Sequence, residues 1–430
     1  MKRAPILVFF ILTVLAPSAQ AQEKEKAQVV EDPELEFSGY GELSFGWLNY
    51  GEDQTREGGA WRDSRLVFDS TRFVLKAEME LPADFEFEAE IEFEHGGTGS
   101  ALELEYEEFG EYEQEIEKGG EVILEEFYLS RTFSDLVRVR VGRFYTAVGL
   151  LSYHYRPGDL IASGRPESET TILPAVWDEM GADVRLKWNW LEATAQVING
   201  LDSTGFSSQG WVSTGHQTRF EFIRARGLAG VLRLDFVPID GLKAGVSAYY
   251  GDTAKNRPKP DLAKDCNDPE EARVAPCGYV SAGLLILDAH FSLELGPARA
   301  KGLLLWGNLE NADVISARNR NLSNFLNVLR SEVAEQAILA WGELGVDLLH
   351  GFDTKWRLEP HLRFEYYDTM FRVAEGVFDP PRFERYVASA GVGADYDNSV
   401  MARLTTRYRW FGDSSLRDQT EVFLTTGFHY

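Results

Sequence analysis

The sequence has few basic residues for its length, and this shortage excludes a class of partner. Lys and Arg total 43 against 69 Asp and Glu in 430 residues, so the formal net charge is −26. No stretch is rich in Lys and Arg, and a nucleic-acid partner is therefore excluded, because phosphate neutralisation needs a basic surface. Hydrophobic residues make up 44% and aromatic residues 13% of the chain, which is too apolar for a disordered acidic protein. The chain therefore folds.

Long apolar runs are also lacking, and the longest one lies near the start. Lys2 and Arg3 precede the apolar residues 4–16, and residues 18–21 then provide a small-x-small cleavage site. Such a run falls short of the roughly 20 apolar residues that span a bilayer, so a membrane anchor is the less favoured alternative. The layout predicts a secretory signal peptide over residues 1–21, followed by a charged lead over residues 22–35.

Cysteine is scarce as well. Cys266 and Cys277 are the two cysteines of the chain, with ten residues between them in a polar segment. In an exported chain this spacing predicts one disulfide that closes a local loop. A metal site needs more ligands than this pair offers and no histidine lies between them, so we expect no metal and no cofactor.

Apolar residues recur with period two along most of the chain, which is typical of strands. In residues 85–94 one face is wholly apolar and the other is wholly acidic, and residues 242–248, 356–365 and 402–410 repeat the alternation. These segments are generally longer than the five or six residues of an average soluble strand, and their length suits a tilted strand that crosses a membrane.

Short and long connections alternate between these strands. Seven short turns and eight long loops predict sixteen strands with both chain ends on the short-turn side. This is the plan of an all-β, transmembrane antiparallel barrel of about 16 strands, with short periplasmic turns and long external loops, over residues 36–430. The short turns fall at 82–84, 134–135, 189, 238–241, 296–297, 351–353 and 397–399, and the long loops at 51–63, 96–120, 147–178, 200–218, 251–277, 308–336, 368–384 and 411–418.

Aromatic residues support the same plan. The chain ends in an alternating segment, 422–430, with a terminal tyrosine, and this resembles the closing strand by which outer-membrane barrels are recognised for assembly. Tryptophan and tyrosine at strand ends are expected to form girdles at the two membrane interfaces. These expected girdle residues are Trp47, Tyr50, Trp188, Trp190, Trp306, Trp341, Trp356 and Trp410.

If the apolar phase of each strand faces lipid, the charged phase faces the lumen. The charges there are nearly balanced, but strand 85–94 is acidic whereas the fifth and fifteenth strands are basic. The lumenal phase of the fourth strand, 121–133, is not decided by its pattern. Burying so many ionised groups without water would be costly, so the pattern predicts a water-filled channel for passive diffusion of small hydrophilic solutes and ions.

At the loop after the fifth strand, the chain resembles bacterial outer-membrane porins, and within them the phosphate-selective O/P-type family and its uncharacterised relatives. The likeness rests on Val141-Gly142-Arg143-Phe144, on the stretch from Arg165-Pro166 to Gly181, and on residues 197–202. It implies a bacterial outer-membrane location, a third external loop folded into the barrel, and a homotrimer in contact with lipid and lipopolysaccharide. Ala147-Val148 stands where the family has Pro-Phe, and no lysine series lines the lumen, so an anion- or phosphate-selective porin is the alternative function.

A charged constriction is predicted where the inserted loop faces the barrel wall, because rings of charged side chains set ion selectivity. Wall residues of the fifth and fifteenth strands would face charged residues of the loop. The predicted constriction residues are Arg138, Arg140, Arg156, Asp159, Arg165, Glu167, Glu169, Arg403, Arg407 and Arg409.

Three other functions remain as alternatives. An outer-membrane barrel enzyme is disfavoured, because the seven histidines are scattered and no nucleophile-elbow or zinc motif is present. A plugged uptake receptor has no room for a plug domain before the first strand. A purely structural barrel would lack a continuous water path. We therefore predict a porin without catalytic residues.

Overall fold

The structure is a computed structural model that describes residues 35–49, 64–95, 121–153, 155–217, 223–258, 260–263, 280–320 and 331–430. The chain divides into two units, Met1–Glu34 and Leu35–Tyr430, and every described residue belongs to the second. The predicted signal peptide and the predicted disulfide between Cys266 and Cys277 lie outside the described residues, so both stay predictions.

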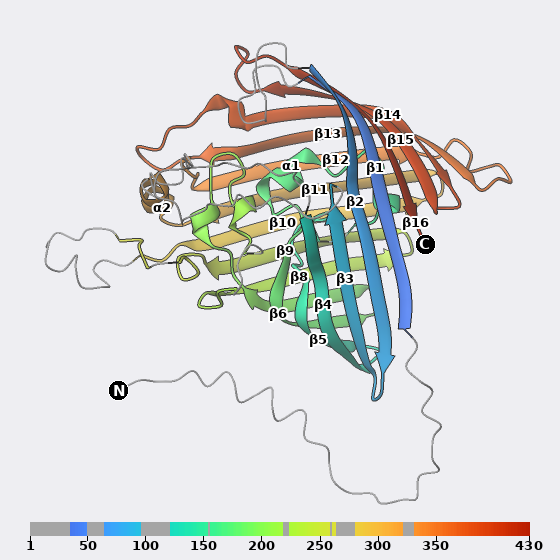
Figure 1. Ribbon diagram of the computed structural model, residues 1–430, viewed down its shortest axis with the longest axis horizontal. Helices are drawn as coiled ribbons and strands as arrows, with labels where there is room; N and C mark the ends of the chain where they lie inside the picture. Colours follow the sequence, from blue (N-terminus) through green and yellow to red (C-terminus); the bar gives the residue numbers. More distant parts are fainter. Residues whose placement is uncertain are drawn as a thin grey trace, which may run out of the picture. The chain divides into compact units, whose positions relative to one another are not determined.

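Sixteen antiparallel strands form one closed barrel, as predicted. Each strand pairs with its neighbours in sequence, and β1 pairs with β16 to close the ring (Figure 1). The strands are β1 (Leu35–Asn49), β2 (Ser64–Leu81), β3 (Phe85–Glu94), β4 (Glu121–Ser134), β5 (Val137–Tyr145), β6 (Asp178–Trp188), β7 (Leu191–Asn199), β8 (Leu228–Ile239), β9 (Leu242–Asp252), β10 (Gly283–Leu295), β11 (Ala298–Leu309), β12 (Gln336–Val346), β13 (Trp356–Arg372), β14 (Glu384–Tyr396), β15 (Val400–Phe411) and β16 (Gln419–His429).

The turns follow from their sequences. Asp397 and Asn398, between β14 and β15, have φ angles of 52° and 54°, which is the left-handed pair that a tight hairpin turn requires. The predicted end of the fourth long loop at residue 218 is wrong, because β8 begins only at Leu228. Just before β8, the backbone N–H groups of Arg224 and Gly227 donate to the side chains of Gln217 and Asn256.

The two faces of the sheet differ as the alternation predicts. On the outside Leu66, Phe68 and Leu362 are 70%, 86% and 63% exposed, whereas Glu90 and Arg403 on the inside are each 2% exposed. An apolar outer surface on a closed barrel is stable in lipid, where every strand backbone finds a partner within the sheet.

A β-bulge in β4 explains why the phase of this strand could not be predicted. The register against β3 shifts between Glu90 and Ile91, so Glu125 and Glu126 both point inward, at 0% and 5% exposure. Before the bulge Leu124 faces outward, and after it Phe127 does. One extra residue therefore switches the outward phase from even to odd numbers.

The girdle prediction fails for one tryptophan. Trp188, Trp190 and Trp356 are exposed at strand ends, as expected of interfacial aromatics. Trp341 instead points inward and is 5% exposed, because it shares the inward phase of β12 with Glu343.

Helices occur in the long connections, and none in the described part of the chain is long and apolar enough to cross a membrane. Loop 3, residues 146–177 between β5 and β6, contains two of them. The helices are η2 (Pro157–Asp159), α1 (Glu167–Ile172), η3 (Ser203–Gly205), η4 (Ser213–Gly215), α2 (Ala312–Arg320) and η7 (Pro381–Phe383).

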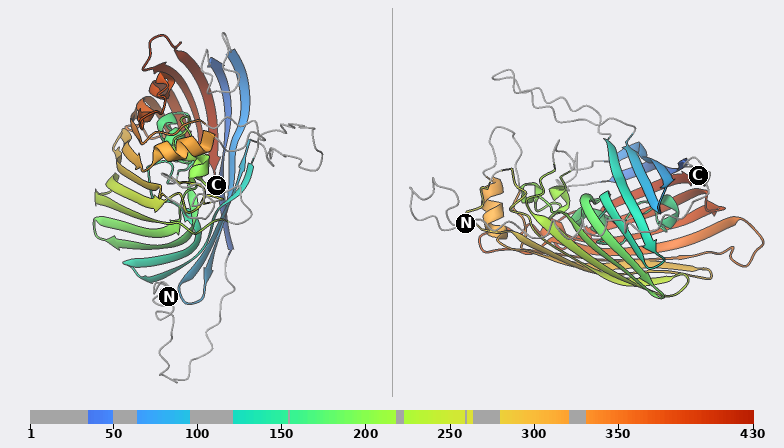
Figure 2. Two further views of the ribbon diagram at one scale, coloured as in Figure 1. Left: turned by 90° about the vertical axis from the view of Figure 1, so that its left-hand side faces the viewer. Right: turned by 90° about the horizontal axis from the view of Figure 1, so that it is seen from below.

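Loop 3 lies inside the barrel. Its helix α1 contacts β12 and β13, and η2 contacts β1 and β16, so the loop reaches the far wall from its start at β5 (Figure 2, left). An apolar core surrounds it toward the long-loop end of the barrel, where Trp177 and Trp211 pack with Leu284, Leu305 and Leu339 of the inner wall. This part of the inward phase is therefore packed and apolar, in contrast to the charged, water-filled lumen that was predicted.

Candidate functional site

An ion-pair cluster around Glu167 of α1 joins loop 3 to the wall. Its carboxylate accepts two contacts from the Arg409 guanidinium, one of them at 2.8 Å, and lies 3.6 Å from Arg407 and 3.7 Å from Arg385. The side chains of Glu167 and Arg409 are buried. The three arginines come from β14 and β15, so this cluster joins α1 to the wall.

Glu169 organises the first part of the loop. Its Oε1 accepts backbone N–H bonds from Leu150, Leu151 and Ser152 at 2.7–2.9 Å, and its Oε2 accepts the Trp341 indole N–H at 3.0 Å. Burial raises the pKa of this carboxyl, and the four N–H donors oppose that rise because they favour the ionised form. Glu169 is therefore a positioning residue.

Serine side chains fasten the middle of loop 3 to the same wall. Ser163 donates its hydroxyl to the Arg403 carbonyl and its backbone N–H to Thr405 Oγ1, both at 3.0 Å. Ser168 donates its N–H and its hydroxyl to Glu365 Oε2 at 2.8 Å. Arg403 thus meets the loop through its backbone, while its guanidinium lies 3.3 Å from Asp395.

The tip of loop 3 is held by its backbone. The Asp159 carbonyl accepts bonds from Arg299 and Lys301 of β11, and the Asp159 carboxylate accepts the Arg156 backbone N–H at 2.8 Å. The Arg156 side chain is exposed. Arg165 stacks 4.7 Å from the centre of the Tyr155 ring.

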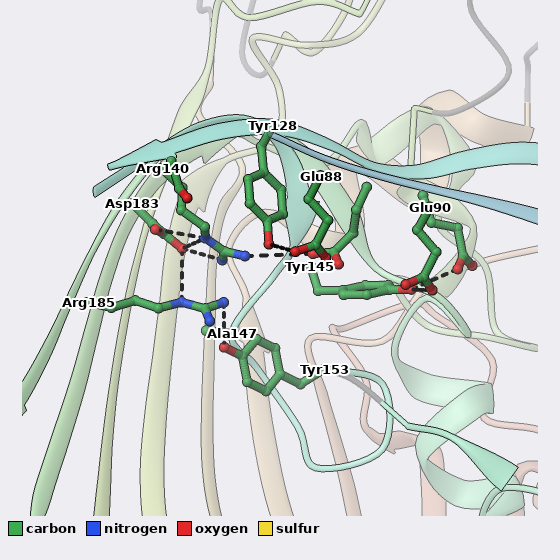
Figure 3. A network of polar contacts seen from close by, with 12 residues as sticks. Glu88, Glu90, Tyr128, Arg140, Tyr145, Ala147, Tyr153, Asp183 and Arg185 are labelled. Carbon is green, nitrogen blue, oxygen red and sulfur yellow. Dashed lines mark hydrogen bonds and ion pairs between the residues drawn. The ribbon is translucent and has the colours of Figure 1, made fainter. Parts of the chain in front are cut away.

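Arg138 and Arg140 lie elsewhere, on β5, and do not face the loop carboxylates. Arg138 contacts Glu86 at 2.9 Å. Arg140 holds both oxygens of Asp183 from its Nε at 3.0 Å and lies over the Tyr128 ring (Figure 3). The ten predicted constriction residues therefore occupy separate places: Glu167, Glu169, Arg403, Arg407 and Arg409 along the α1 contact, Arg156, Asp159 and Arg165 near the tip, and Arg138 and Arg140 on β5.

The root of loop 3 is clamped from both sides, by residues that the sequence did not identify as contacts. The Gly149 N–H donates to Asp288 at 2.8 Å and its carbonyl accepts from Arg233 at 2.7 Å. Arg385 and Trp341 were also missed as loop contacts. For Arg385 a signal existed, because it shares the inward phase of β14 with Asp395.

The lumenal charges at this level are paired and buried, which differs from the prediction of charges in water. The side chains of Arg363 and Glu343 contact each other and are both fully buried. Arg72 likewise contacts Glu125 at 2.8 Å. Isolated buried ions would cost several kcal/mol each, so mutual pairing is what makes this packing possible.

An open cavity of about 660 Å³ lies at the short-turn end of the barrel, lined by inner-wall residues of β2 to β9 and the turn between β4 and β5. Arg140, Tyr145 and Tyr153 border it on the side of loop 3. We call this cavity the vestibule.

One polar cluster bears on the enzyme alternative. Ser247 donates to Asp288, whose other oxygen lies 2.7 Å from His290 Nδ1, and His290 Nε2 lies 2.8 Å from Asp235. A hydrolytic triad needs the histidine between the serine and the carboxylate, so that it can accept the serine proton. Here the carboxylate lies between them, and the cluster is buried beside loop 3.

Within the described ranges, two groups of three carboxylates have the spacing of metal ligands. They are Glu78, Glu86 and Glu88, and Glu88, Glu90 and Glu126, with ligand oxygens within 4.8 Å of one another. Lys76 already contacts Glu78 and Glu88 at 2.8 and 2.9 Å, so an ammonium group occupies the first group.

No protein-family model matches the chain. An uncharacterized protein of Aquifex aeolicus (strain VF5) is 26% identical over 135 residues, so the match spans 31% of this chain and 31% of that relative's length.

Several solved structures share the fold. An anion-selective porin from Comamonas acidovorans has a TM-score of 0.51 at 10% identity over 93% of this chain and 100% of its own. Salmonella typhi OmpF, in complex with daunomycin, has a TM-score of 0.52 at 11% sequence identity, over 92% of this chain and 97% of its own. The outer membrane channel DcaP of Acinetobacter baumannii has a TM-score of 0.51 at 10% sequence identity, over 93% of this chain and 97% of its own. The chain has the fold of bacterial outer-membrane porins.

Proposed function

We propose that the chain is an outer-membrane porin, through which small hydrophilic solutes and ions diffuse passively past loop 3. The observation that carries this proposal is a closed sixteen-strand barrel with an apolar outer surface, a charged inner surface and a vestibule at one end. Porin neighbours with the same fold support it. The mechanism needs no cofactor and no turnover.

The paired charges around loop 3 set the expected size of the passage. Because the α1 contact is packed, solutes cross beside it or when it loosens, and the channel is expected to have a small conductance. The predicted constriction is accordingly proposed at the α1 contact, with Glu167 and Arg409 as its central pair.

Anion selectivity is the second candidate. Arg385, Arg407 and Arg409 cluster on one wall and would favour anions. Glu167 and Glu421 offset much of their charge, so phosphate specificity is not part of this proposal. The signal peptide, the homotrimer and the contact with lipopolysaccharide belong to the proposal as inferences from the resemblance to porins.

The test is single-channel recording of the refolded protein in a planar lipid bilayer. Steady unit steps above a protein-free control support a porin, and the reversal potential under a KCl gradient gives the preferred ion sign. Block by added inorganic phosphate would favour the phosphate alternative. A folded barrel that gives no steps would overturn the porin function.

A further inference from the structure

The vestibule carries two neighbouring sectors of opposite charge. Along β2, β3 and β4 four glutamates accompany one lysine, a formal charge of −3. Along β5 and β6 three arginines and a lysine accompany one aspartate, a formal charge of +3. The acidic sector is Glu78, Glu86, Glu88 and Glu126 with Lys76, and the basic sector is Arg138, Arg140, Arg185 and Lys187 with Asp183, which lies beneath Arg140.

The other charges of the vestibule lining are compensated, in part by Lys187 of the basic sector. Glu192 lies 2.9 Å from Lys243 and 3.6 Å from Lys187, and Asp235 lies 2.9 Å from Arg233. Asp135, on the turn between β4 and β5, stands at the rim and is exposed. The two sectors touch, because Arg138 lies 2.9 Å from Glu86 and Arg140 lies 3.6 Å from Glu126. Among the described residues, Glu78 and Arg185 form no ion pair across this boundary, and they are the charges that remain for a solute.

The acidic sector is built to hold an ammonium group. Oxygens of Glu78, Glu86 and Glu88 lie within 4.8 Å of one another, and the Lys76 ammonium already contacts two of these residues. Glu78 is 37% exposed on its side chain, so one carboxylate of this group remains open to the vestibule.

The basic sector is built to hold a carboxylate. Arg140 takes both oxygens of Asp183, which leaves the Arg185 Nε 3.6 Å from that carboxylate. Among the described residues Arg185 Nε has no hydrogen-bond partner, and Arg185 Nη2 donates to the Tyr153 hydroxyl at 3.1 Å (Figure 3). The Arg185 side chain is 34% exposed and borders the vestibule.

We propose that the vestibule is a binding site for zwitterionic solutes of the amino-acid class. The ammonium group of the solute lies against Glu78 and the other acidic-sector glutamates, and its carboxylate lies against Arg185 and Lys187. A singly charged ion gains from one sector and loses to the other, whereas a zwitterion gains from both. This inference rests on the proposed porin function, because the solute must pass through the barrel.

The test is a swelling assay with liposomes that contain the refolded full chain. Glycine is compared with glycolamide, its uncharged isomer, and rates from protein-free liposomes are subtracted. The wild-type protein should admit glycine about threefold faster than glycolamide. Glu78→Gln and Arg185→Gln should each bring this ratio close to one.

Matched controls separate the possible failures. Glu294→Gln removes a charge outside both sectors, from a side chain that is 58% exposed, and should keep the wild-type ratio. If a neutral variant does not fold, Glu78→Asp and Arg185→Lys keep the charges and should keep most of the preference. Equal rates for the two solutes in the wild type, or a preference that both neutral variants retain, would overturn the vestibule site alone. No swelling with either solute would overturn the porin function.

Discussion

Glu167 of α1 accepts a two-point contact from Arg409 of β15, although 242 residues of sequence separate them. The same carboxylate accepts a bond from the Tyr367 hydroxyl of β13. One loop residue therefore ties α1 to β13 and β15 of the barrel wall, and the position of α1 in the lumen depends on this contact.

Glu167→Gln is expected to loosen loop 3. Removing one partner of a buried ion pair costs about 3–5 kcal/mol, since the other charge stays buried. Arg385, Arg407 and Arg409 would lose much of their compensation, so the channel should fluctuate more and shift toward anion preference. Single-channel recording with a KCl gradient measures both effects.

The control for this experiment is Glu294→Gln, which removes an equal charge from an exposed side chain at the short-turn end. Identical current traces and reversal potentials for Glu167→Gln and the wild type would exclude the α1 contact as the constriction.

Glu169→Leu is expected to free the first part of loop 3 without unfolding the barrel. The change leaves three backbone N–H groups and the Trp341 indole without their acceptor, which costs about 3 kcal/mol or more. Hydrogen exchange at residues 150–152 should accelerate about 100-fold, while the strand amides keep their protection.

Glu375→Gln, an exposed glutamate in the loop between β13 and β14, is the matched control for Glu169→Leu. Unchanged exchange at residues 150–152 in the Glu169 variant would mean that other contacts hold the loop root.

The strands were predictable because one physical rule governs their whole length. Lipid outside and polar groups inside impose period two, and Phe85 to Glu94 obeys it throughout. The rule failed at Glu125, where a bulge changes the phase, since an inserted residue leaves no mark in a pattern that is locally ambiguous.

The site was harder to predict, because its contacts join residues that alternation does not relate. Alternation places Arg407 and Arg409 inside, but nothing in the sequence pairs them with Glu167. The same limit hid Trp341, which was expected at a strand end but is the middle residue of β12, where its indole bonds to Glu169 inside the barrel. Contacts between a folded loop and a distant wall depend on the path of the loop.

The loop between β7 and β8 is expected to weaken in acid. Burial lowers the pKa of His216 to about 4, and its Nε2 lies 2.6 Å from the Asp178 carbonyl oxygen. Between pH 4 and the ordinary value of about 6.5, a detached loop binds a proton that the folded loop does not. The stabilisation from the neutral imidazole is therefore present above pH 6.5 and is lost as the pH falls toward 4.

Hydrogen exchange across residues 203–217, corrected for the intrinsic rate at each pH, measures this effect. His216→Gln keeps a donor for the Asp178 carbonyl and should remove the pH dependence between 4 and 6.5. An equal pH dependence in both proteins would assign the effect to another group.

The outer surface predicts how charge is tolerated at different depths of the membrane. Leu362 faces outward opposite Ala390, the middle residue of β14, whereas Leu66 pairs with Trp47 near the long-loop end of β1. An arginine at the bilayer midplane costs about 2–4 kcal/mol, and near an interface about 0–1 kcal/mol. Leu362→Arg should therefore lower the free energy of unfolding in lipid vesicles far more than Leu66→Arg.

Guanidinium titrations followed by tryptophan fluorescence measure this difference, and the two variants should differ much less in detergent micelles. Equal losses for both variants in vesicles would mean that the apolar outer surface is not buried in lipid as the barrel requires.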